Sequence, residues 1–565
     1  MHRDRYDVIV VGSGAAGMTA ALAAAKHGLR AVVVEKATHF GGSTARSGGG
    51  VWIPNNEVLR ASGVADTPQA AARYLHAIVG DVVAADRIDT FLQRGPEALS
   101  FLLANTPLRM RWVPGYSDYY PESPGGRVGG RSVEPVPFDG RRLGPDLAEL
   151  EPPYGAAPLN VAVTQGDYRW ATLVLRHPRG IVRVLRIGLR WMLATLTGKR
   201  LLVMGQALAA GLRAGLREAG VPVLLETPLV DLHVEDDDRV TGVLVATGAD
   251  RRVLHARHAV VLATGGFEHN AALRQRFQRA PIGSDWTVGA AANTGDGVLA
   301  GRRIGGALEL MDDAWWGPSI PLPGGPWFCL AERTLPGCIL IDRSGERFVN
   351  EAAPYVDAVH AMYGGRYGQG DGPGEHIPCW LVLDQRYRNR YFFAGLRPRA
   401  PFPRRWYRSG VVVRAPSLER LAEQLEVNPA ALARTVETFN GFARAGRDAD
   451  FGRGESGYDR YYGDPRNRPN PCLGVIDTAP FYAVRIVPGD LGTKGGLRTD
   501  VHGRVLRPDG SVIAGLFAAG NASSPVMGHT YAGPGATIGP AVTFGYLAAL
   551  EIARQAAEQV ASGAQ

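Results

Sequence analysis

Three glycines and one carboxylate near the start of the chain have the spacing of a nucleotide-binding site. Gly12, Gly14 and Gly17 follow an apolar, β-branched run at residues 8–11, and Glu35 lies 23 residues beyond the first glycine. Glycines at this spacing let the backbone approach a pyrophosphate, and the N-terminus of the following helix offers it free N–H groups. The carboxylate can accept hydrogen bonds from ribose hydroxyls. A purely structural turn is the weaker interpretation, because a strand precedes the glycines and a helix, a strand and an acid follow them.

A second glycine-rich segment indicates that the dinucleotide is FAD rather than NAD. Residues 41–50 read GGSTARSGGG, and a backbone this free of side chains suits a second close approach along an extended cofactor. A short glycine loop at residues 264–266 is a further candidate contact. The residues that we expect to bind FAD are Gly12, Gly14, Ala15, Ala16, Gly17, Glu35, Lys36, Gly41, Gly42, Ser43, Thr44, Ser47, Gly48, Gly49, Val230, Thr264, Gly265, Asn293, Asp296, Gly520, Asn521, Gly535 and Ile538.

The segments that must position these residues alternate between strand and helix patterns, as in an α/β domain. Two helices in the second half of the chain are also expected, at residues 417–424 and 429–442, the second with Asn428 as N-cap and Pro429 in its first turn. The other expected elements are helices at 15–25 and 206–219, strands at 31–34, 221–225, 229–234 and 259–263, a helix opened by 293–297, a strand and turn at 515–521, and a final helix at 541–556.

The length of the chain requires more than one hydrophobic core, because 565 residues exceed what a single core supports. Composition shifts near Asp312, where tryptophans and a Pro/Gly-rich stretch begin, and the strand and glycine turn near the end return to the first domain. The predicted fold class is α/β, with a Rossmann-type FAD-binding domain and an inserted α+β catalytic domain. The predicted boundaries are 1–312 and 490–565 for the FAD-binding domain and 313–489 for the catalytic domain.

Composition also disfavours several classes of protein. The longest apolar runs fall short of the ~18 residues that span a bilayer, and we expect no signal peptide. The cysteines Cys329, Cys338, Cys379 and Cys472 form no C-x-x-C pair, and no H-E-x-x-H occurs. The expectation is therefore a cytoplasmic protein without a metal site or a disulfide framework.

The net charge of +8 is concentrated in one segment. Residues 169–200 contain eight basic residues and no acid, and the arginines from 176 to 190 are spaced 3, 4, 3 and 4, which places them on one face of a helix. Apolar residues and a tryptophan occupy the other faces, at about 176–193. Such a helix suits the headgroup region of an anionic membrane. It does not favour nucleic acid, because one helix is not a broad basic patch. A surface helix whose apolar face covers the core is an equally open interpretation.

We do not expect binding to nucleic acid, and if the helix touches a membrane it does so at the inner face of the cell membrane as a peripheral contact.

The chain resembles the bacterial 3-ketosteroid Δ1-dehydrogenases, within the wider group of fumarate-reductase-like flavoproteins. The resemblance covers nearly the full length, and its most specific parts are three tyrosine-bearing segments. The matching segments are Gly12–Gly17, residues 41–44, Asp118-Tyr119-Tyr120, residues 293–296, Glu346–Glu351 with Pro354-Tyr355, residues 489–496, and His529-Thr530-Tyr531-Ala532-Gly533-Pro534-Gly535. Ala532 departs from the family pattern, in which we expect proline, and this weakens the expectation that Gly535 is tightly preorganised.

The resemblance implies a reaction and a role for each tyrosine. A 3-ketosteroid would lose a proton from C2 and a hydride from C1, and flavin N5 would accept the hydride. By resemblance, the Tyr531 hydroxyl and the Gly535 N–H polarise the C3 carbonyl, Tyr355 is the base and Tyr119 is its hydrogen-bonding helper. Because a free tyrosine has a pKa near ~10, we expect this base to be depressed by its tyrosine partner and by nearby positive potential. Trp315, Trp316, Trp327 and Phe328 line the steroid cleft or, as an equally open alternative, pack a domain interface.

Several alternatives stay open on the sequence alone. A 3-ketosteroid Δ4-(5α)-dehydrogenase would share the flavin segments, and a fumarate-reductase-type dicarboxylate reductase would need a cationic cluster that residues 529–539 lack. A non-catalytic flavin- or sterol-binding protein is a rival of a different class. No second nucleotide fingerprint occurs, so we expect a quinone or another acceptor rather than NAD(P)H to reoxidise the flavin. The glycine-rich loop at 364–374 follows no strand, and we interpret it as a lid or surface turn. The basic segment favours substrates that include side-chain-bearing sterones such as cholest-4-en-3-one.

Overall fold

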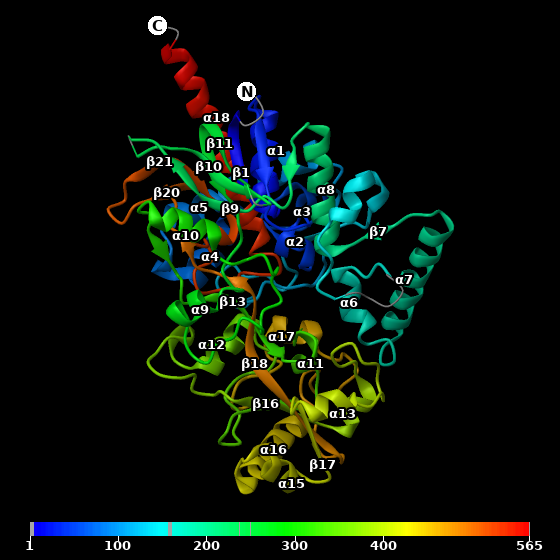
Figure 1. The fold of residues 1–565 in the computed structure, drawn as a ribbon. Helices are drawn as coiled ribbons and strands as arrows, with labels where there is room; N and C mark the ends of the chain where they lie inside the picture. Colours follow the sequence, from blue (N-terminus) through cyan, green and yellow to red (C-terminus); the bar gives the residue numbers. More distant parts are fainter. Residues whose placement is uncertain (1–4, 156–160, 237, 249, 564–565) are drawn as a thin grey trace.

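The computed structural model describes residues 5–155, 161–236, 238–248 and 250–563. The expectation of no signal peptide rests partly on residues 1–4, which lie outside the described residues. Figure 1 shows two regions, one built on each of two sheets, with the first strand, β1 (Arg5–Val11), and the last helix, α18 (Ile538–Gly563), in the first region.

A large mixed sheet forms the core of the FAD-binding domain. Its strands lie in the order β20-β21-β11-β1-β2-β8, and β10 pairs with both β11 and β9. The central pairs β1–β11, β1–β2 and β11–β21 are parallel, which brings the carboxyl ends of these strands to one edge. The strands are β1 (Arg5–Val11), β2 (Ala31–Val34), β8 (Val223–Leu224), β9 (Leu229–Val234), β10 (Val240–Thr247), β11 (Asp250–Leu262), β20 (Arg504–Leu506) and β21 (Val512–Ala518).

Helices α1 (Ala15–Lys26), α8 (Met204–Glu218) and α18 (Ile538–Gly563) pack beside this sheet, and α1 lies against both of the others. The apolar side chains of β1 and β2 alternate between two buried clusters on the two faces of the sheet. The remaining elements of this part are α2 (Gly42–Arg46), α3 (Glu57–Ala61), α4 (Pro68–Val79), α5 (Ala85–Asn105), α6 (Gln165–Ala171), α7 (Pro178–Leu196), α9 (Ala271–Phe277), α10 (Asp296–Arg303), β3 (Val51–Trp52), β4 (Met110–Trp112), β5 (Ser132–Pro135), β6 (Phe138–Asp139), β7 (Leu201–Leu202), β12 (Leu308–Glu309) and β19 (Gly496–Leu497).

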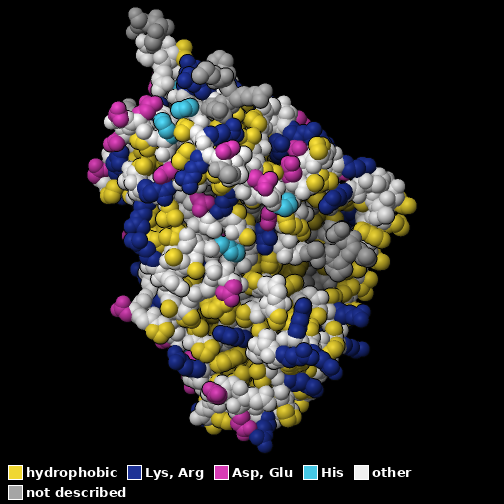
Figure 2. Space-filling model, viewed as in Figure 1, with side chains coloured by type: hydrophobic (Ala, Val, Ile, Leu, Met, Phe, Trp, Pro, Cys, Tyr) yellow, Lys and Arg dark blue, Asp and Glu magenta, His cyan; other side chains and the backbone are white. Residues whose placement is uncertain are grey.

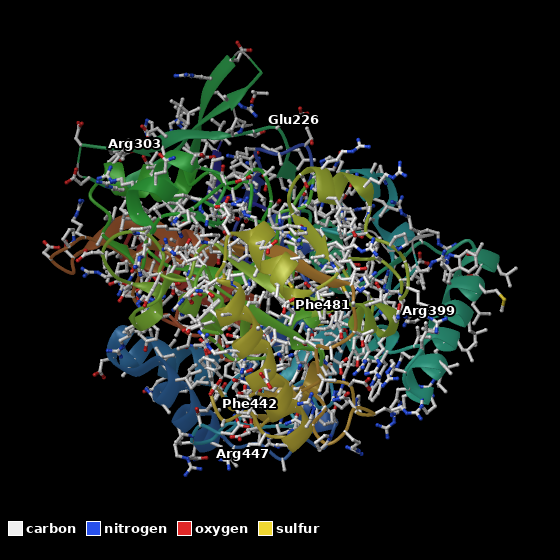
Figure 3. The ribbon with its side chains drawn as sticks, turned by 90° about the horizontal axis from the view of Figure 1, so that it is seen from below. Glu226, Arg303, Arg399, Phe442, Arg447 and Phe481 are labelled. Carbon is white, nitrogen blue, oxygen red and sulfur yellow. The ribbon has the colours of Figure 1, made fainter. Side chains whose placement is uncertain are left out.

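An antiparallel sheet forms the core of the second domain. Its strands lie in the order β14-β13-β18-β16-β15, with β17 paired to β18. This sheet and its helices make an α+β unit inserted into the Rossmann-type domain, as the sequence predicted. The elements are β13 (Ala314–Ile320), β14 (Trp327–Phe328), β15 (Cys338–Ile341), β16 (Cys379–Asp384), β17 (Val412–Ala415), β18 (Phe481–Thr493), α11 (Ala331–Thr334), α12 (Tyr355–Tyr363), α13 (Gln385–Arg390), α14 (Arg404–Arg408), α15 (Leu418–Leu425), α16 (Pro429–Ala445) and α17 (Gly457–Tyr462). Figure 3 views this domain end-on, with Phe442 and Phe481 among the labelled residues.

Helix α7 corrects the prediction about the basic segment. The helix begins at Pro178 with His177 as its N-cap, so Arg176 lies outside it and bonds Asp464 at 2.8 Å. Arg183 and Arg190 turn toward the body of the protein and bond the carboxylate of Asp167 at 3.1 and 2.6 Å. The large apolar side chains are exposed instead, namely Ile181, Val182, Val184, Leu185, Leu189, Trp191, Met192, Leu193 and Leu196. Most of the large apolar side chains of α7 therefore do not cover the core, although Ile187 and Ala194 are buried, and Asp167 holds Arg183 and Arg190 on the inner side of the helix.

The loop at 364–374 is a surface turn folded around a cation. The guanidinium of Arg279 donates to the carbonyl oxygens of Gly364, Gly368 and Gly372 at 3.3, 3.2 and 3.1 Å. A phosphate-binding loop presents N–H groups to its ligand, whereas this loop presents carbonyl oxygens inward.

A buried charge network holds the segment that leads into α12. The Glu351 carboxylate accepts from Arg347 at 2.8 Å and from Arg453 at 3.0 Å, and it also accepts the N–H of Leu340 at 3.1 Å. Burial by itself raises the pKa of Glu351, but the two arginines hold that pKa below its usual value of 4.5. The motif at residues 346–351 thus supports the fold four residues before Tyr355.

We predict that Glu351→Gln lowers the free energy of unfolding by about 3 kcal/mol, because it leaves buried arginines without a full counter-charge. Glu423→Gln is the control, since Glu423 bonds Arg420 at the surface at 2.7 Å and such pairs contribute about 0–1 kcal/mol. Urea unfolding at pH 7 measures both. The difference in unfolding free energy between the variant and the wild type should shrink as the pH falls below 4.5, the usual pKa of Glu351. A carboxylate whose pKa is lowered by folding stabilises the protein while it is ionised, and this stabilisation is lost as the carboxylate becomes protonated. Equal stabilities at pH 7 would contradict the prediction.

Candidate active site

A cavity of about 2120 Å³ lies between the two domains and is lined by residues of both. It is larger than the ~300–1,000 Å³ of a typical small-molecule site, so it has room for a dinucleotide and a second ligand. Its lining has three parts. The cofactor part is formed by the glycine loops, the tyrosine part by Tyr116, Tyr119, Tyr355, Tyr462 and Tyr531, and the α7 part by Val174, Val184, Ile187, Trp191 and Ala194.

Most residues predicted to bind FAD line the cofactor part. They are Gly12, Gly14, Ala15, Ala16, Glu35, Lys36, Gly42, Ser43, Thr44, Ser47, Gly48, Gly49, Thr264, Gly265, Asn293, Asp296, Gly520, Asn521, Gly535 and Ile538. Gly17, Gly41 and Val230 do not line the cavity. A Cβ on Gly17 would lie 2.0 Å from the carbonyl oxygen of Gly12, so this glycine serves the close packing of α1 on the preceding turn. Beside Val230, it is Leu229 that reaches the cavity.

The acid of the fingerprint is held in place by its own loop. The Glu35 carboxylate accepts from the N–H and the hydroxyl of Ser13 at 3.0 and 2.6 Å, and from the N–H of Ala37 at 3.0 Å. Lys36 bonds Asp296 at 2.6 Å and so ties the second strand to the start of α10. Sequence reasoning missed Ser13, which lines the cavity between the predicted glycines and orients the acid.

A hydrogen-bonded chain behind the cofactor part includes a carboxylate that the sequence analysis did not single out. The Ser43 hydroxyl accepts from Asn293 at 3.0 Å, and the Asn293 amide donates to Glu268 at 2.6 Å. Glu268 is buried, and burial raises its pKa to about 7. Asn293 thereby joins the second glycine-rich segment to the loop after β11.

The residues of the cofactor part fit FAD. Helix α1 starts at its glycine turn with no side-chain cap and no acid in its first turn, which leaves its positive end for a diphosphate. The Thr264 hydroxyl is buried and has no hydrogen-bond partner within the described residues, so it is free to bond a ligand. Gly12 and Gly41 have φ values of 106°, in the region that favours glycine.

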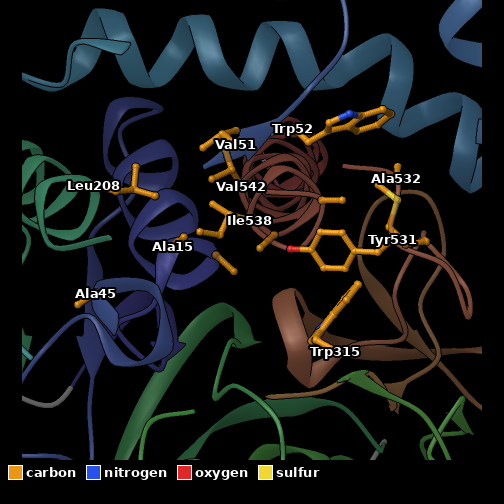
Figure 4. Close-up of a cluster of buried hydrophobic side chains, with 14 of the residues drawn as sticks. Ala15, Ala45, Val51, Trp52, Leu208, Trp315, Tyr531, Ala532, Ile538 and Val542 are labelled. Carbon is orange, nitrogen blue, oxygen red and sulfur yellow. The ribbon is translucent and has the colours of Figure 1, made fainter. Parts of the chain in front are cut away.

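The structure brings together the predicted tyrosines from three distant segments. The ring centroids of Tyr119 and Tyr355 are 5.3 Å apart, those of Tyr119 and Tyr531 are 5.1 Å apart, and those of Tyr355 and Tyr531 are 5.4 Å apart. All three side chains are buried. In Figure 4 the Tyr531 ring lies beside Trp315, and its hydroxyl points toward the helix that carries Ile538. This cluster forms one wall of the tyrosine part.

Each tyrosine is positioned by a different element. Tyr355 is the first residue of α12. Tyr119 follows Asp118, a buried carboxylate that accepts from Trp52 Nε1 at 2.9 Å and pairs with Arg131. Tyr531 lies in the loop before α18, whose later residue Gly535 has a φ of 95°.

The loop that carries Tyr531 is fixed by hydrogen bonds rather than by a proline. The Ala532 carbonyl oxygen accepts from the Tyr119 N–H at 3.0 Å and from the Tyr74 hydroxyl at 2.6 Å. The Pro534 carbonyl accepts from the Ser132 hydroxyl at 2.6 Å. These contacts hold the backbone at residue 532, and the expectation that alanine there weakens the preorganisation of Gly535 stays a prediction.

The pKa of Tyr355, the expected base, is raised rather than lowered by its surroundings in the protein. Burial raises the pKa of Tyr355 well above its usual value of 10.0, Tyr531 and Tyr116 raise it further, and a hydrogen bond with Tyr119 lowers it. Tyr119 therefore acts in the expected direction. The largest influences on this pKa are burial and the neighbouring tyrosines, and the expected contribution of a positive potential stays a prediction.

The aromatic residues divide between the two interpretations left open by the sequence. Trp327 and Phe328 line the cavity, and the Phe328 ring lies 5.2 Å from that of Tyr355. Trp316 packs against Tyr363 in the buried core instead. The sequence analysis also missed the cavity-lining residues Tyr116, Tyr168, Tyr462 and Glu332, because nothing in their local sequence marks them.

The chain is similar to known flavoproteins over nearly its whole length. Residues 7–538 match the FAD binding domain family. The chain is 63% identical to the 3-oxosteroid 1-dehydrogenase of Mycolicibacterium smegmatis, over 99% of each chain. The crystal structure of 3-ketosteroid Δ1-dehydrogenase from Sterolibacterium denitrificans in complex with 1,4-androstadiene-3,17-dione matches with a TM-score of 0.92 and 40% identity, over 98% of this chain and 100% of that one. A 3-ketosteroid-Δ4-(5α)-dehydrogenase from Rhodococcus jostii matches with a TM-score of 0.67 at 21% identity, over 98% of this chain and 97% of that one, which shows a shared fold alone.

The fold and the cofactor part define an FAD-dependent oxidoreductase. The chain belongs to the 3-oxosteroid 1-dehydrogenase family, as the resemblance of its tyrosine segments indicated.

We predict that Gly535→Ala destabilises the protein and abolishes flavin reduction by a ketosteroid. A Cβ at this position would lie 2.3 Å from the carbonyl carbon of Gly50, in addition to the strain of a positive φ. Gly28→Ala is the matched control, because Gly28 has a φ of 83° and nothing within 4 Å of an added Cβ. Urea unfolding with FAD present should show a loss of about 1 kcal/mol for the control and about 3 kcal/mol for Gly535→Ala. Equal losses would contradict the role of the close contact.

Proposed function

We propose that this chain desaturates 3-ketosteroids between C1 and C2 and that Tyr119, Tyr355, Tyr531 and Gly535 are its catalytic residues. The observation that carries the proposal is the meeting of the three buried tyrosines in a cavity that also receives the cofactor loops. FAD, when bound, supplies the two-electron oxidant for C1. The relatives named for this reaction match nearly the whole chain, which supports the same assignment.

The donor pair for the C3 carbonyl is Tyr531 and Gly535. The Gly535 N–H lies close enough to the Tyr531 hydroxyl to lower its pKa by hydrogen bonding, and Thr537 also donates to that hydroxyl, at 3.2 Å. A carbonyl oxygen placed between the hydroxyl and the N–H would accept from both. Each such donor can stabilise a developing oxyanion by about 3 kcal/mol.

Tyr355 takes the C2 proton in this proposal, and Tyr119 stabilises it. A buried phenol is a poor base until its phenolate is stabilised, and the hydrogen bond from Tyr119 provides that stabilisation. Polarising the C3 carbonyl makes C2 more acidic at the same time. The donor pair acts at C3 and Tyr355 acts at the neighbouring C2. The rings of Tyr355 and Tyr531 are in contact, so both groups can reach adjacent atoms of one substrate.

The competing functions are less well supported. A dicarboxylate reductase needs cations that clamp two carboxylates. Among the described residues that line the cavity, Lys36 is bound to Asp296 at 2.6 Å and Arg46 to Glu151 at 3.2 Å, and the other Lys and Arg residues, Lys199 and Arg200, are exposed residues that follow α7. The Δ4-(5α)-dehydrogenase shares the fold, and analysis of the product formed from a saturated 3-ketosteroid separates the two positions of desaturation.

The α7 part of the cavity supports substrates that carry a side chain. Residues on the inner face of α7, including Ile187 and Ala194, line the same cavity as Tyr355 and Tyr531. An apolar passage from the tyrosines to this helix suits the alkyl chain of a sterone such as cholest-4-en-3-one. We extend the proposal to such substrates.

We also propose that α7 contacts a membrane from the side that its exposed apolar residues form. Figures 1 and 3, viewed 90° apart, both place α7 at the periphery, and Figure 2 shows hydrophobic side chains along that edge. Leu185 and Leu196 are 67% and 76% exposed, and Arg179 and Arg186 are exposed cations of the same helix. This combination suits a helix lying in an anionic interface. None of the helices in the described residues has the length and apolarity to cross a bilayer.

A quinone or another non-nucleotide acceptor is proposed for reoxidation of the flavin. The support is the lack of a second nucleotide fingerprint in the sequence. A quinone would also meet the enzyme at the membrane surface that α7 contacts.

We predict that Tyr355→Phe still binds a 3-ketosteroid but reduces its flavin at least ~100-fold more slowly, the lower bound for loss of a general base. Tyr363→Phe is the control, because Tyr363 lies on the same helix and donates to the Pro281 carbonyl at 2.9 Å, away from the cavity. Anaerobic mixing with 4-androstene-3,17-dione, followed by flavin absorbance, gives the rates. Bleaching of Tyr355→Phe at the wild-type rate would remove Tyr355 as the base, and a wild type that never bleaches would overturn the desaturase itself.

We predict that Leu185→Asp weakens binding to vesicles of phosphatidylcholine and phosphatidylglycerol more than tenfold. Withdrawing one leucine from an apolar surface loses about 2 kcal/mol, and the new charge repels the anionic lipid. Val128→Asp is the control, since Val128 is 57% exposed and lies outside α7. Sedimentation with vesicles measures the affinity. Wild-type binding by Leu185→Asp, or no binding by the wild type, would contradict membrane contact through α7.

A further inference from the structure

Glu332 is a buried acid in the wall of the cavity, and the function proposed above does not use it. The residue belongs to α11, is 4% exposed and lines the same cavity as Tyr355. Its Oε1 atom accepts from Nε1 of Trp327 at 2.8 Å and from the N–H of Ala394 at 3.0 Å. Its Oε2 atom is also buried, but it has no hydrogen-bond partner within the described residues. A buried polar atom without a partner costs free energy, so Oε2 is a candidate contact for a ligand.

The surroundings of Glu332 favour the neutral acid. Burial raises the pKa of this carboxyl above its usual value of 4.5, and its hydrogen bonds offset only part of that effect. The neighbouring cation, Arg333, donates instead to three backbone carbonyl oxygens, those of Cys329, Glu351 and Ala353, at 3.2, 2.5 and 2.8 Å. A neutral carboxyl group has one O–H donor. Because Oε1 already accepts two hydrogen bonds, the proton belongs on Oε2.

An aromatic wall lies between this acid and the proposed base. The ring of Phe328 is 5.2 Å from that of Tyr355, and Trp327, its neighbour in β14, bonds Glu332. Both aromatic residues line the cavity. Tyr168 of α6 lines it from the first domain, and its pKa is raised by burial and then by Glu332, so the two side chains are near each other. The acid is therefore a polar group beside an otherwise apolar wall, which is typical of a group that fixes the orientation of a ligand.

A 3-ketosteroid held for the proposed reaction extends away from the donor pair. Its C3 carbonyl lies at one end of the ring system, between Tyr531 and Gly535 in the proposed function. C17 lies at the opposite end of the rings. In a 3,17-dione that end carries a second carbonyl oxygen, which needs a hydrogen-bond donor when it leaves water.

We propose that Glu332 is a specificity-determining residue whose Oε2–H donates a hydrogen bond to an oxygen at C17 of the steroid. The inference rests on the function proposed above, because that function places C3 at Tyr531 and Gly535. The oxygen supplies the partner that Oε2 lacks, and the rings cover the aromatic wall. A steroid with an alkyl chain at C17 places carbon against the acid and forms no such bond. Glu332 thus favours steroids that carry oxygen at C17 over side-chain-bearing sterones in the same cavity.

The test compares two ligands that differ only at C17, androsta-1,4-diene-3,17-dione and androsta-1,4-dien-3-one. Both are already desaturated between C1 and C2, so they bind without reducing the flavin, and the change in flavin absorbance gives the Kd of each for the holoenzyme. The ratio of the two Kd values isolates the effect of the C17 oxygen. For Glu332→Leu we expect the preference for the dione to fall about fivefold, which corresponds to a net hydrogen bond of about 1 kcal/mol. Glu332→Gln retains a donor and should keep the wild-type ratio.

Tyr154 provides a matched control. It lines the same cavity, and its hydroxyl donates to the Pro326 carbonyl at 2.7 Å and accepts from the N–H of Phe328 at 2.8 Å. Because both of these partners belong to the protein, Tyr154→Phe removes a hydroxyl from the same wall without removing a bond to the ligand. This variant should keep the wild-type ratio even if it binds both ligands more weakly.

A second measurement needs no variant, and it applies if Glu332→Leu does not fold with FAD. The C17 carbonyl stretch of the dione, labelled with carbon-13 at C17, should lie at a lower wavenumber in the wild-type complex than in hexane, because a hydrogen bond weakens the C=O bond. An unshifted band would overturn the role of Glu332.

A wild-type ratio in Glu332→Leu, or affinity lost by the same factor for both ligands, would also overturn that role, since a packing defect does not distinguish the ligands by their C17 oxygen. These results leave the proposed desaturation intact as long as the wild type reduces its flavin with 4-androstene-3,17-dione. A wild type that fails to do so would overturn the proposed function and, with it, the assignment of Glu332.

Discussion

The carbonyl oxygen of Ala532 accepts hydrogen bonds from the N–H of Tyr119 and from the hydroxyl of Tyr74. These bonds fasten the loop before α18 to the segment after β4, which lie more than 400 residues apart in the sequence, as the positions 119 and 532 show. Tyr119, Tyr531 and Gly535 depend on this junction for their relative positions. A buried backbone oxygen that lost both donors would be an unsatisfied polar group, which costs free energy. This cost holds the two loops together.

The tyrosine cluster shows why a buried phenol needs neighbours to act as a base. Burial disfavours the phenolate and raises the pKa of Tyr355, and a hydrogen bond with Tyr119 opposes that effect. Hydrogen bonds that strengthen as charge develops can stabilise the transition state without stabilising a resting phenolate.

Helix α7 shows how one buried acid can reverse the orientation of an amphipathic helix. Arg183 and Arg190 bond Asp167, and most of the large apolar side chains of the helix are left at the surface. The same helix lines the cavity with Ile187 and Ala194. Its outer face and its inner face thus serve one proposed task, the transfer of an apolar substrate from a lipid surface to the tyrosines.

The sequence by itself determined the cofactor and most of the local structure. The strand at 31–34 was predicted with the bounds that the structure has, and Asn428 caps its helix as expected, because glycine turns, caps and short apolar runs act over a few neighbouring residues. The final helix begins at Ile538, three residues before the prediction, and the domain boundaries at 312 and 489 and the roles of the site residues stay predictions. Tyr119, Tyr355 and Tyr531 came from the resemblance, since nothing in their own neighbours distinguishes a catalytic tyrosine. Only the tertiary structure decided that Tyr116 and Tyr462 adjoin them and that α7 turns Arg183 and Arg190 inward, because both facts depend on contacts between separate segments of the chain.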